Sequence, residues 1–296
     1  MDNGNKTSSR ECRFLDKSYF KGLYEAFIEA FSDYVIPFAL TETQFKNHIV
    51  LNAVDLDQTA GYFVGDKLAG FSLNGFGDWD GQQTVYDAGT GVIPAYRRQG
   101  MSESMFEMMM PIFLGKGIKQ GLLEVVTENS GAITLYKKLG YEIVRELALL
   151  QCDTRLDLTS RASTDVEVKE IADPDWELFS TFWDGVPSWQ NSIKAVHRSR
   201  NMKRIFGAFL NGKCVGYIIF SSKFGRVAQF AVDPVHRRRG IGTALLNALH
   251  GATAAGYSLQ VVNIDKHIGN AMAFLQNRGF YERLSQYEMV LDMTTT

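Results

Sequence analysis

The stretch that decides the fold occurs twice in this chain. It reads Val92-Ile93-Pro94-Ala95-Tyr96-Arg97-Arg98-Gln99-Gly100-Met101-Ser102 in the first half and Val232-Asp233-Pro234-Val235-His236-Arg237-Arg238-Arg239-Gly240-Ile241-Gly242 in the second. The two central glycines, Gly100 and Gly240, are 140 positions apart (240 − 100). Solenoid repeats have periods of roughly 20–50 residues. A period of this length therefore indicates a duplicated domain.

The similarity continues downstream of this stretch. Leu135-Tyr136-Lys137-Lys138-Leu139-Gly140-Tyr141 corresponds to Phe274-Leu275-Gln276-Asn277-Arg278-Gly279-Phe280, where the glycines are 139 positions apart (279 − 140). The length of 296 residues also fits two domains of roughly 100–200 residues each. We predict an N-terminal domain at 1–150, a polar linker at 151–164 and a C-terminal domain at 165–296.

The composition excludes several classes of protein. The hydrophobic content of 45% is ordinary for a globular protein, and the net charge of −2 supplies no overall field that would attract nucleic acid. The three cysteines are scattered and show no metal-ligand spacing. The first residues lack the apolar segment of a signal peptide, and no apolar run reaches the roughly 20 residues of a membrane helix. We expect a cytoplasmic protein with no metal and with neither nucleic acid nor membrane as a partner.

Hydrophobic periodicity predicts an α+β fold for each half, with an early helical region, a meander of strands and then a β-α-β-α-β segment. In the first half we expect a helix over 15–31, strands over 61–64 and 68–73, a glycine-rich loop over 74–83, a strand over 84–93 and a helix over 102–114. Pro111 should kink this last helix or end it early. The meander implies antiparallel pairing, and the β-α-β segment adds one parallel step.

The basic turn of each copy has the chemistry of an anion site. Small residues two positions apart at the start of a helix let a ligand approach the backbone, where N–H groups and the helix dipole favour negative charge. Flanking arginines suit a pyrophosphate. The run Gly240 to Leu245 lacks the third glycine of a dinucleotide-binding fingerprint, and no Walker sequence is present. A nucleotide-binding protein is therefore disfavoured.

The pattern Arg-x-x-Gly-x-Gly/small after Val-x-Pro resembles the acetyl-CoA motif of the GNAT superfamily of N-acetyltransferases. Arg237, Gly240 and Gly242 match it fully. Arg97 and Gly100 also match it, although Ser102, which is itself small, replaces the last glycine or alanine. The resemblance covers both halves. It implies two tandem domains, each with a mixed, mostly antiparallel, splayed sheet flanked by helices in an α/β/α arrangement.

The resemblance also implies acetyl-CoA as co-substrate and assigns residues to it. The pantetheine would bind the backbone of Val92 and Ile93 in one half, and of Val232 and Asp233 in the other. The pyrophosphate would bind the two turns, which contain Arg97, Arg98, Gln99, Gly100, Met101 and Ser102, and Arg237, Arg238, Arg239, Gly240, Ile241 and Gly242. Asn129, which opens the Asn-x-x-Ala-x-x-Leu-Tyr arrangement typical of the family, is a further cofactor-binding candidate.

Acetylation of an amine requires removal of a proton from the ammonium and stabilisation of the leaving thiolate. Relatives often use a tyrosine on the late helix as the acid, and Tyr136 stands at that position, although it can equally be a packing residue. The second half has Leu275 there, which cannot donate a proton. Asp87 and Glu124 are both candidate bases, and water can also remove the proton. Each acid can equally be structural.

The acceptor site of this family lies near the end of the first helix, where Asp33 and Tyr34 stand. Asp33 can hold a cationic amine, or it can cap a turn. The acceptor can be a small amine, an aminoglycoside-like molecule, an amino acid or a peptide N-terminus. Two similar domains can pack like a dimer, so we expect a pseudo-dimeric monomer or a homodimer.

The sequence therefore predicts a tandem acyltransferase that moves acetyl from acetyl-CoA to a primary amine by direct attack in a ternary complex. The first half would carry the chemistry, because it has Tyr136. One alternative places the activity in the second half. Another is a CoA-binding sensor or scaffold without turnover, which the departures at Ser102 and Leu275 would favour.

Overall fold

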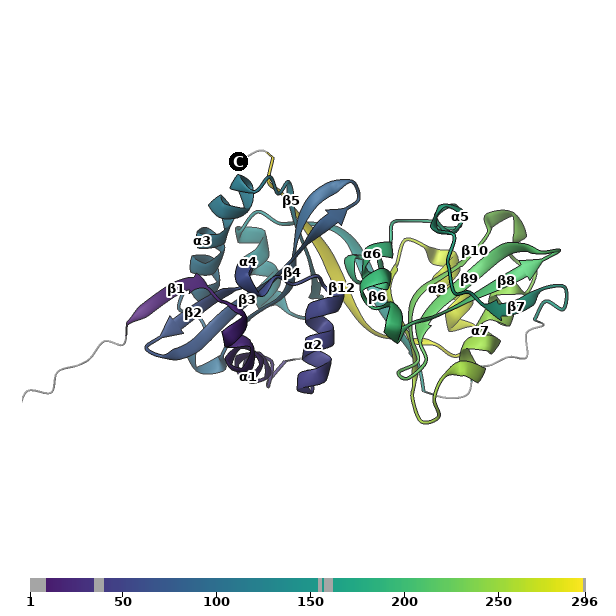
Figure 1. Cartoon of the computed structure of the whole chain (residues 1–296), viewed down its shortest axis with the longest axis horizontal. Coiled ribbons are helices and arrows are strands. Elements are labelled where there is room, and N and C mark those ends of the chain that lie inside the picture. The colour runs from purple at the N-terminus through teal and green to yellow at the C-terminus, as the bar shows by residue number, and fades with distance from the viewer. Residues whose placement is uncertain (1–8, 35–39, 154–155, 157–161, 295–296) are drawn as a thin grey trace, which may run out of the picture. The chain divides into compact units, whose positions relative to one another are not determined.

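The structure is a computed structural model that describes residues 9–34, 40–153, 156 and 162–294 (Figure 1). The chain divides into two compact units: unit 1 is Met1–Ile143 with Met289–Thr296, and unit 2 is Val144–Glu288. Each unit contains one of the two basic turns, as the duplication predicts.

The unit boundaries differ from the predicted domain boundaries at residues 150 and 165. Unit 2 already begins at Val144, and the last residues of the chain belong to unit 1. The predicted linker at 151–164 therefore lies within unit 2. Its residues 154–155 and 157–161 lie outside the described residues.

Unit 1 is built around a mixed sheet with the order β1-β2-β3-β4-β5-β12. Its strands pair antiparallel from β1 to β4, and β4 pairs with β5 in parallel. Its elements from residue 10 to residue 138 are β1 (Arg10–Phe14), α1 (Phe20–Ala30), α2 (Glu42–Leu51), β2 (Ala60–Val64), β3 (Lys67–Trp79), β4 (Gln82–Val92), α3 (Met101–Gly115), β5 (Gln120–Val126) and α4 (Ser130–Lys138).

Helices α1 and α3 cover opposite faces of this sheet. Phe71 of β3 packs its ring against Phe27 of α1, with centroids 5.7 Å apart. A Cβ on the neighbouring Gly70 would instead lie 3.5 Å from Met105 of α3. Because successive strand residues point to opposite faces, the two helices sandwich the sheet.

Unit 2 repeats the arrangement with the order β7-β8-β9-β10-β11-β6, and β12 lies next to β6. Here β10 and β11 form the parallel step. Its elements from residue 167 to residue 276 are β7 (Glu167–Glu170), α5 (Trp176–Ser180), α6 (Ile193–Arg198), β8 (Arg204–Leu210), β9 (Lys213–Ser221), β10 (Arg226–Val232), α7 (Ile241–Ala252), β11 (Leu259–Asp265) and α8 (Gly269–Gln276).

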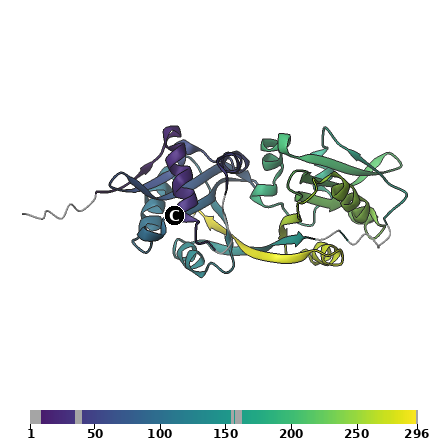
Figure 2. The same cartoon turned by 90° about the horizontal axis from the view of Figure 1, so that it is seen from below.

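The last strand of each half completes the unit of the other half. Strand β6 (Glu142–Cys152) follows α4 in the chain, but its residues from Val144 belong to unit 2, where Leu150 pairs antiparallel with Val261 of β11. Strand β12 (Tyr281–Asp292) begins in unit 2 and ends in unit 1, next to β5. Figure 2 shows β12 in yellow along its length.

Two predictions from the sequence were wrong, namely a loop over 74–83 and an early end of the helix at Pro111. The expected loop over 74–83 is a long hairpin in which β3 runs to Trp79 and β4 begins at Gln82. Gly75 serves close packing there, because a Cβ on it would lie 2.0 Å from the Asn52 carbonyl oxygen. Helix α3 continues past Pro111 to Gly115. We attribute this to burial of Phe113, which is 2% exposed and offsets the roughly 3 kcal/mol that an interior proline costs.

The end of the chain should contribute to the stability of unit 1. Met293 donates its N–H to the Lys119 carbonyl oxygen at 2.9 Å, and its side chain, 3% exposed, joins a core cluster with Met105 and Phe113. We expect Met293→Ala to lower the free energy of unfolding by about 2–5 kcal/mol, measured by urea denaturation. Hydrogen exchange should accelerate in β5. The exposed neighbour Thr294→Ala is the control, and an equal effect of both variants would refute the assignment.

Candidate functional site

The two basic turns have the same backbone conformation. Arg98 and Gly100 have φ values of 60° and 75°, and Arg238 and Gly240 have 63° and 78°. Left-handed residues that alternate with ordinary ones turn successive N–H groups toward one concavity, which binds oxyanions. A Cβ on Gly100 would meet no atom within 4 Å, so the space beside this turn is open.

In unit 1 the first arginine of the motif, Arg97, connects the turn to the rest of the unit by hydrogen bonds. Arg97 donates Nε to the Val92 carbonyl oxygen at 3.1 Å and an NH2 group to the Ala30 carbonyl oxygen at 2.9 Å. Both its terminal nitrogens lie 2.7 Å from the carboxylate oxygens of Asp33, and this hydrogen bonding lowers the pKa of Asp33. The carboxylate that we expected to hold an acceptor amine is therefore bound to Arg97.

Unit 2 contains the same set of bonds. Arg237 donates Nε to the Val232 carbonyl oxygen at 2.9 Å, NH2 to the Phe182 carbonyl oxygen at 3.0 Å and NH1 to Asp184 at 2.9 Å. Arg97 and Arg237 thus orient the backbone that would bind pyrophosphate, and their own charges are directed at protein groups.

The remaining turn residues contribute mainly backbone. The side chains of Met101 and Ile241 are buried, and those of Arg98, Arg238 and Arg239 are exposed. Gln99 accepts a hydrogen bond from Arg10. Gly242 is closely packed, because a Cβ on it would lie 2.9 Å from the Phe274 ring, which would have to shift. Its counterpart Ser102 lines a small cavity beside Leu135.

Two of the four strand residues that we predicted to bind pantetheine use their backbone N–H groups in hydrogen bonds to neighbouring strands. Ile93 and Asp233 donate their N–H groups to the neighbouring strands, at Ala69 and Val215. Since backbone groups alternate in direction along an antiparallel strand, those of Val92 and Val232 point to the other side, toward the neighbour in the parallel step. Their N–H groups are the better placed for pantetheine.

Both sheets open at the same position. In unit 1 the parallel pairing of β4 with β5 ends at Asp87 and Leu123, and in unit 2 that of β10 with β11 ends at Val227 and Val261. The next residue of β4 and β10 lies in a β-bulge, at Ala88 and Ala228, 140 positions apart (228 − 88). A bulge redirects a strand, and it here accompanies the splaying of the sheet.

Unit 1 has a polar cluster beside this opening. Tyr136 donates its hydroxyl to Asp87 Oδ2 at 2.9 Å, Thr90 donates to the same oxygen at 2.8 Å, and the Gly89 N–H donates to Oδ1 at 2.9 Å. Ser72 lies 2.9 Å from the Thr90 hydroxyl. Burial raises the pKa of Asp87, and burial together with the neighbouring carboxylate raises the pKa of Tyr136 well above its usual value.

Two of the predicted catalytic residues therefore form one hydrogen-bonded pair. Tyr136 holds its proton toward Asp87, so a base at Asp87 and an acid at Tyr136 cannot act independently. Glu124 is one residue beyond Leu123, the partner of Asp87, and hence on the opposite face of the sheet. It accepts a short hydrogen bond from the Tyr86 hydroxyl.

The same places in unit 2 are apolar. The paired residues Ser72 and Thr90 of unit 1 correspond to the pair Ile218 and Phe230 of unit 2. Asp87 corresponds to Val227, because each is the last residue of its strand in the parallel pairing. With Leu275 at the position of Tyr136, four polar side chains are replaced by Ile218, Phe230, Val227 and Leu275, which all belong to the hydrophobic core or pack against it.

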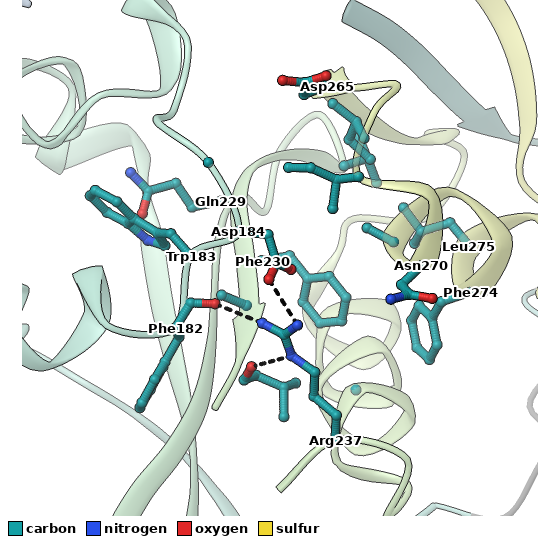
Figure 3. Close-up of a pocket in the computed structure, with 18 of the residues that line it drawn as sticks. Phe182, Trp183, Asp184, Gln229, Phe230, Arg237, Asp265, Asn270, Phe274 and Leu275 are labelled. Atoms are coloured by element: carbon teal, nitrogen blue, oxygen red, sulfur yellow. Dashed lines mark hydrogen bonds and ion pairs between the residues drawn. The ribbon is translucent and has the colours of Figure 1, made fainter. Parts of the chain in front are cut away.

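Unit 2 contains a cavity of about 780 Å³, which Figure 3 shows in close-up. Ligand-binding cavities commonly have volumes of about 300–1,000 Å³. The polar cluster of unit 1 borders a cavity of only about 30 Å³. Half-buried Tyr34 hydrogen-bonds to Asn129, whose Oδ1 also caps α4 through the Ala132 N–H.

Sequence reasoning missed several residues that line the larger cavity, among them Trp183, Asp265, Asn270 and Arg278. Arg278 donates to Thr243 Oγ1 at 2.8 Å, which places a cation beside the first turn of α7. Its place just before the Gly-Phe pair was a signal in the sequence. Asp265 follows a bulge in β11 around Asn263, whose φ is 58°, and no pattern in the sequence indicated that bulge.

Comparison with known proteins agrees with this geometry. A model of the acetyltransferase (GNAT) family matches residues 20–141, and a model of the acetyltransferase (GNAT) domain matches residues 201–284. Each match contains one of the basic turns. The chain belongs to the GNAT acetyltransferase family and carries two domains of it, a family whose members use acetyl-CoA.

One curated relative is a probable N-acetyltransferase san of Drosophila melanogaster, 34% identical over 96 residues. The match covers 32% of this chain and about half (51%) of the relative. Among solved structures, a GCN5-related N-acetyltransferase from Sphaerobacter thermophilus is similar with a TM-score of 0.73 at 12% identity, over 96% of each chain.

A tandem GNAT protein from the clavulanic acid biosynthesis pathway is similar with a TM-score of 0.70 at 14% identity. The match covers 97% of this chain and all (100%) of that one. At such identities these structures establish the fold of the whole chain.

Among the residues that the structure describes, no group of three or more His, Cys, Asp or Glu side chains is arranged to hold a metal ion. No helix in the described part of the chain is long and apolar enough to cross a membrane.

The buried carboxyl of Asp87 should make stability depend on pH. Its pKa is raised in the folded state, so the folded protein binds a proton more tightly than the unfolded chain. As pH rises from the usual aspartate pKa of about 3.9 through the raised value, the wild type should lose stability relative to Asp87→Asn. The slope should be at most about 1.4 kcal/mol per pH unit, measured by urea unfolding.

A second variant tests the cause of this dependence. The Thr90 hydrogen bond lowers the pKa of Asp87, so Thr90→Val should move the window to higher pH. A difference between wild type and Asp87→Asn that does not change with pH would contradict the burial of a titrating carboxyl.

Proposed function

We propose that this protein transfers an acetyl group from acetyl-CoA to a primary amine, and that acetyl-CoA binds in the cavity of unit 2. The position of that cavity carries the proposal. It is lined by Gly240 and Gly242 of the turn, by β10 from Ala228 to Val232 and by β11 from Val261 to Asp265. The cavity thus connects an oxyanion-binding turn with the gap between two splayed strands.

The residues present fit such a substrate. The N–H groups around Gly240 bind the pyrophosphate, and Arg238 and Arg278 add positive charge at the same end of the cavity. The N–H group of Val232, which points away from β9, orients the pantetheine. Phe230 and Phe274 stack with centroids 5.7 Å apart and give the cavity an apolar wall.

Acetyl-CoA supplies the acetyl group as a thioester. The ammonium gives up one proton to solvent, its nitrogen forms a bond to the acetyl carbon, the carbon–sulfur bond breaks, and the nitrogen loses a second proton to solvent. The leaving thiolate then takes a proton from solvent, since Leu275 offers none. Unit 2 would accelerate this reaction mainly by positioning both substrates and by excluding water from the apolar part of the cavity.

A second candidate keeps the chemistry in unit 1, as the sequence suggested. The observation that favours it is the hydrogen bond from Tyr136 to Asp87, which keeps the phenol protonated at neutral pH beside the opening of the sheet. The 30 Å³ cavity there would have to widen to admit a substrate.

Substitution of the turn glycines should identify the unit that binds acetyl-CoA. Valine is strongly disfavoured at positive φ, and it should distort either turn equally, because Gly100 and Gly240 have the same conformation. We expect calorimetry to show one site in the wild type, a loss of affinity of at least tenfold in Gly240→Val and a change below twofold in Gly100→Val. The reverse order would place binding in unit 1, and no binding to the wild type would refute the proposal.

Removal of the Tyr136 hydroxyl should separate the two candidates. A general acid typically contributes 10²–10⁴-fold to a rate. We expect Tyr136→Phe to retain kcat within about threefold in an assay of thiol release, because the proposed chemistry lies in unit 2. A loss of 100-fold or more with intact acetyl-CoA binding would place the chemistry in unit 1. Binding without turnover with any amine would indicate a sensor or scaffold.

A further inference from the structure

We propose that the acceptor of unit 2 is a monoamine with an apolar body, and that Asp265 binds its ammonium group. This inference rests on the proposed function, since it names the second substrate of the same cavity. Three features carry it: the charge at one end of the cavity, the bonds among its polar side chains and the apolar surfaces that remain.

The two ends of the cavity carry opposite charge. At the turn, Arg238 and Arg278 supply two cations. Asp265 lies at the end of β11, and Figure 3 shows it on the opposite side of the view from Arg237 of the turn. A substrate that enters between the strands therefore meets a carboxylate at the end away from the pyrophosphate site.

The arginine near Asp265 is already paired with another carboxylate. Arg145 forms two hydrogen bonds to Glu288, at 2.5 and 2.9 Å, and a third to the Val186 carbonyl oxygen at 2.6 Å. Glu288 is fully buried and compensates the guanidinium. Asp265 Oδ2 lies 3.7 Å from Arg145 NH1, beyond hydrogen-bond distance, so two carboxylates face one guanidinium and a net charge of −1 remains.

Asp265 is also preorganised to bind a cation. Its Oδ1 accepts the His267 N–H at 2.9 Å, which fixes the orientation of the carboxylate. For Oδ2, the described part of the chain provides no donor within hydrogen-bond distance. The side chain is 17% exposed, and the exposed part borders the cavity. A primary ammonium can donate a hydrogen bond to Oδ2, and its positive charge balances the net charge of −1.

Four neutral polar side chains on one side of the cavity are bonded to protein groups. Trp183 donates to the Tyr217 hydroxyl at 2.6 Å, Tyr217 to Gln229 at 2.7 Å, and Gln229 to the Asn191 carbonyl oxygen at 2.5 Å. Asn191 in turn donates to the Val262 carbonyl oxygen at 2.7 Å. This network leaves the ring faces of Trp183 as lining surface.

The side chain of Asn263 is likewise engaged. It donates to Ser188 Oγ at 3.1 Å and accepts from Gln286 at 2.6 Å. Beside these side chains, a hydroxyl-rich acceptor such as an amino sugar would have to break their bonds or leave its hydroxyls unpaired, at about 1–3 kcal/mol for each buried group. Val186, Pro187 and Ile268 add apolar surface, which suits an alkyl or aromatic body.

The test uses the full-length protein with saturating acetyl-CoA and measures thiol release with 2-phenylethylamine and with glucosamine. We expect kcat/KM to be at least tenfold higher for 2-phenylethylamine. Asp265→Asn keeps the bond from His267 but removes the charge, and it should lower kcat/KM for 2-phenylethylamine by about 10- to 100-fold. Asp173→Asn removes an exposed carboxylate elsewhere in unit 2 and should leave the rate unchanged.

Calorimetric titration of 2-phenylethylamine, with and without CoA, gives a readout that does not depend on turnover. Binding to the wild type that is at least tenfold weaker in Asp265→Asn supports the site, even if acetyl-CoA fails to bind and the proposed function falls. Acetyl-CoA binding without any amine binding overturns the inference and leaves the cofactor site intact. Equal use of glucosamine, or an unchanged Asp265→Asn, also overturns it. Thermal unfolding of each variant distinguishes loss of the site from loss of the fold.

Discussion

In each unit, the arginine that opens the basic turn connects this turn by hydrogen bonds to the preceding strand and to the early helical region. In unit 1 the guanidinium of Arg97 bonds to the end of a strand, to the last residue of a helix and to Asp33 just beyond it. Arg237 makes the equivalent bonds in unit 2. A lysine has one donor centre and cannot form this fork. The nest of N–H groups, the start of the following helix and the open strand edge all take their position from these bonds.

Comparison of the two units shows how one fold diverges around one scaffold. Backbone features that create a binding gap are the same in both: the turn, the bulge and the end of the parallel pairing. The side chains beside the gap differ as a set. Unit 1 holds a buried carboxyl with three donors around Asp87, and unit 2 holds apolar groups around Val227. A buried carboxyl without hydrogen-bond donors costs free energy of folding. The carboxyl and its donors are therefore expected to be kept together or replaced together.

Much of this structure could be predicted from the sequence, because the decisive features are local. The period between Gly100 and Gly240, the Arg-x-x-Gly pattern and the loss of a phenol at Leu275 require no knowledge of distant contacts. The ion pair between Arg97 and Asp33 joins residues 64 positions apart, and nothing in either segment indicates it. The cavity was also hidden, because it depends on strand separation and on the bulge at Asn263.

The exchange of last strands was the least predictable feature, and it has a consequence for synthesis. Neither β6 nor β12 has a strict apolar–polar alternation that would show which sheet it joins. Unit 1 receives Met289–Thr296 only after the 145 residues of unit 2 (288 − 144 + 1) have been translated. At 5–20 residues per second this takes roughly 7–30 s. During that interval the edge of β5 lacks its native neighbour β12. Strand β6 or another nascent chain can then pair with this edge.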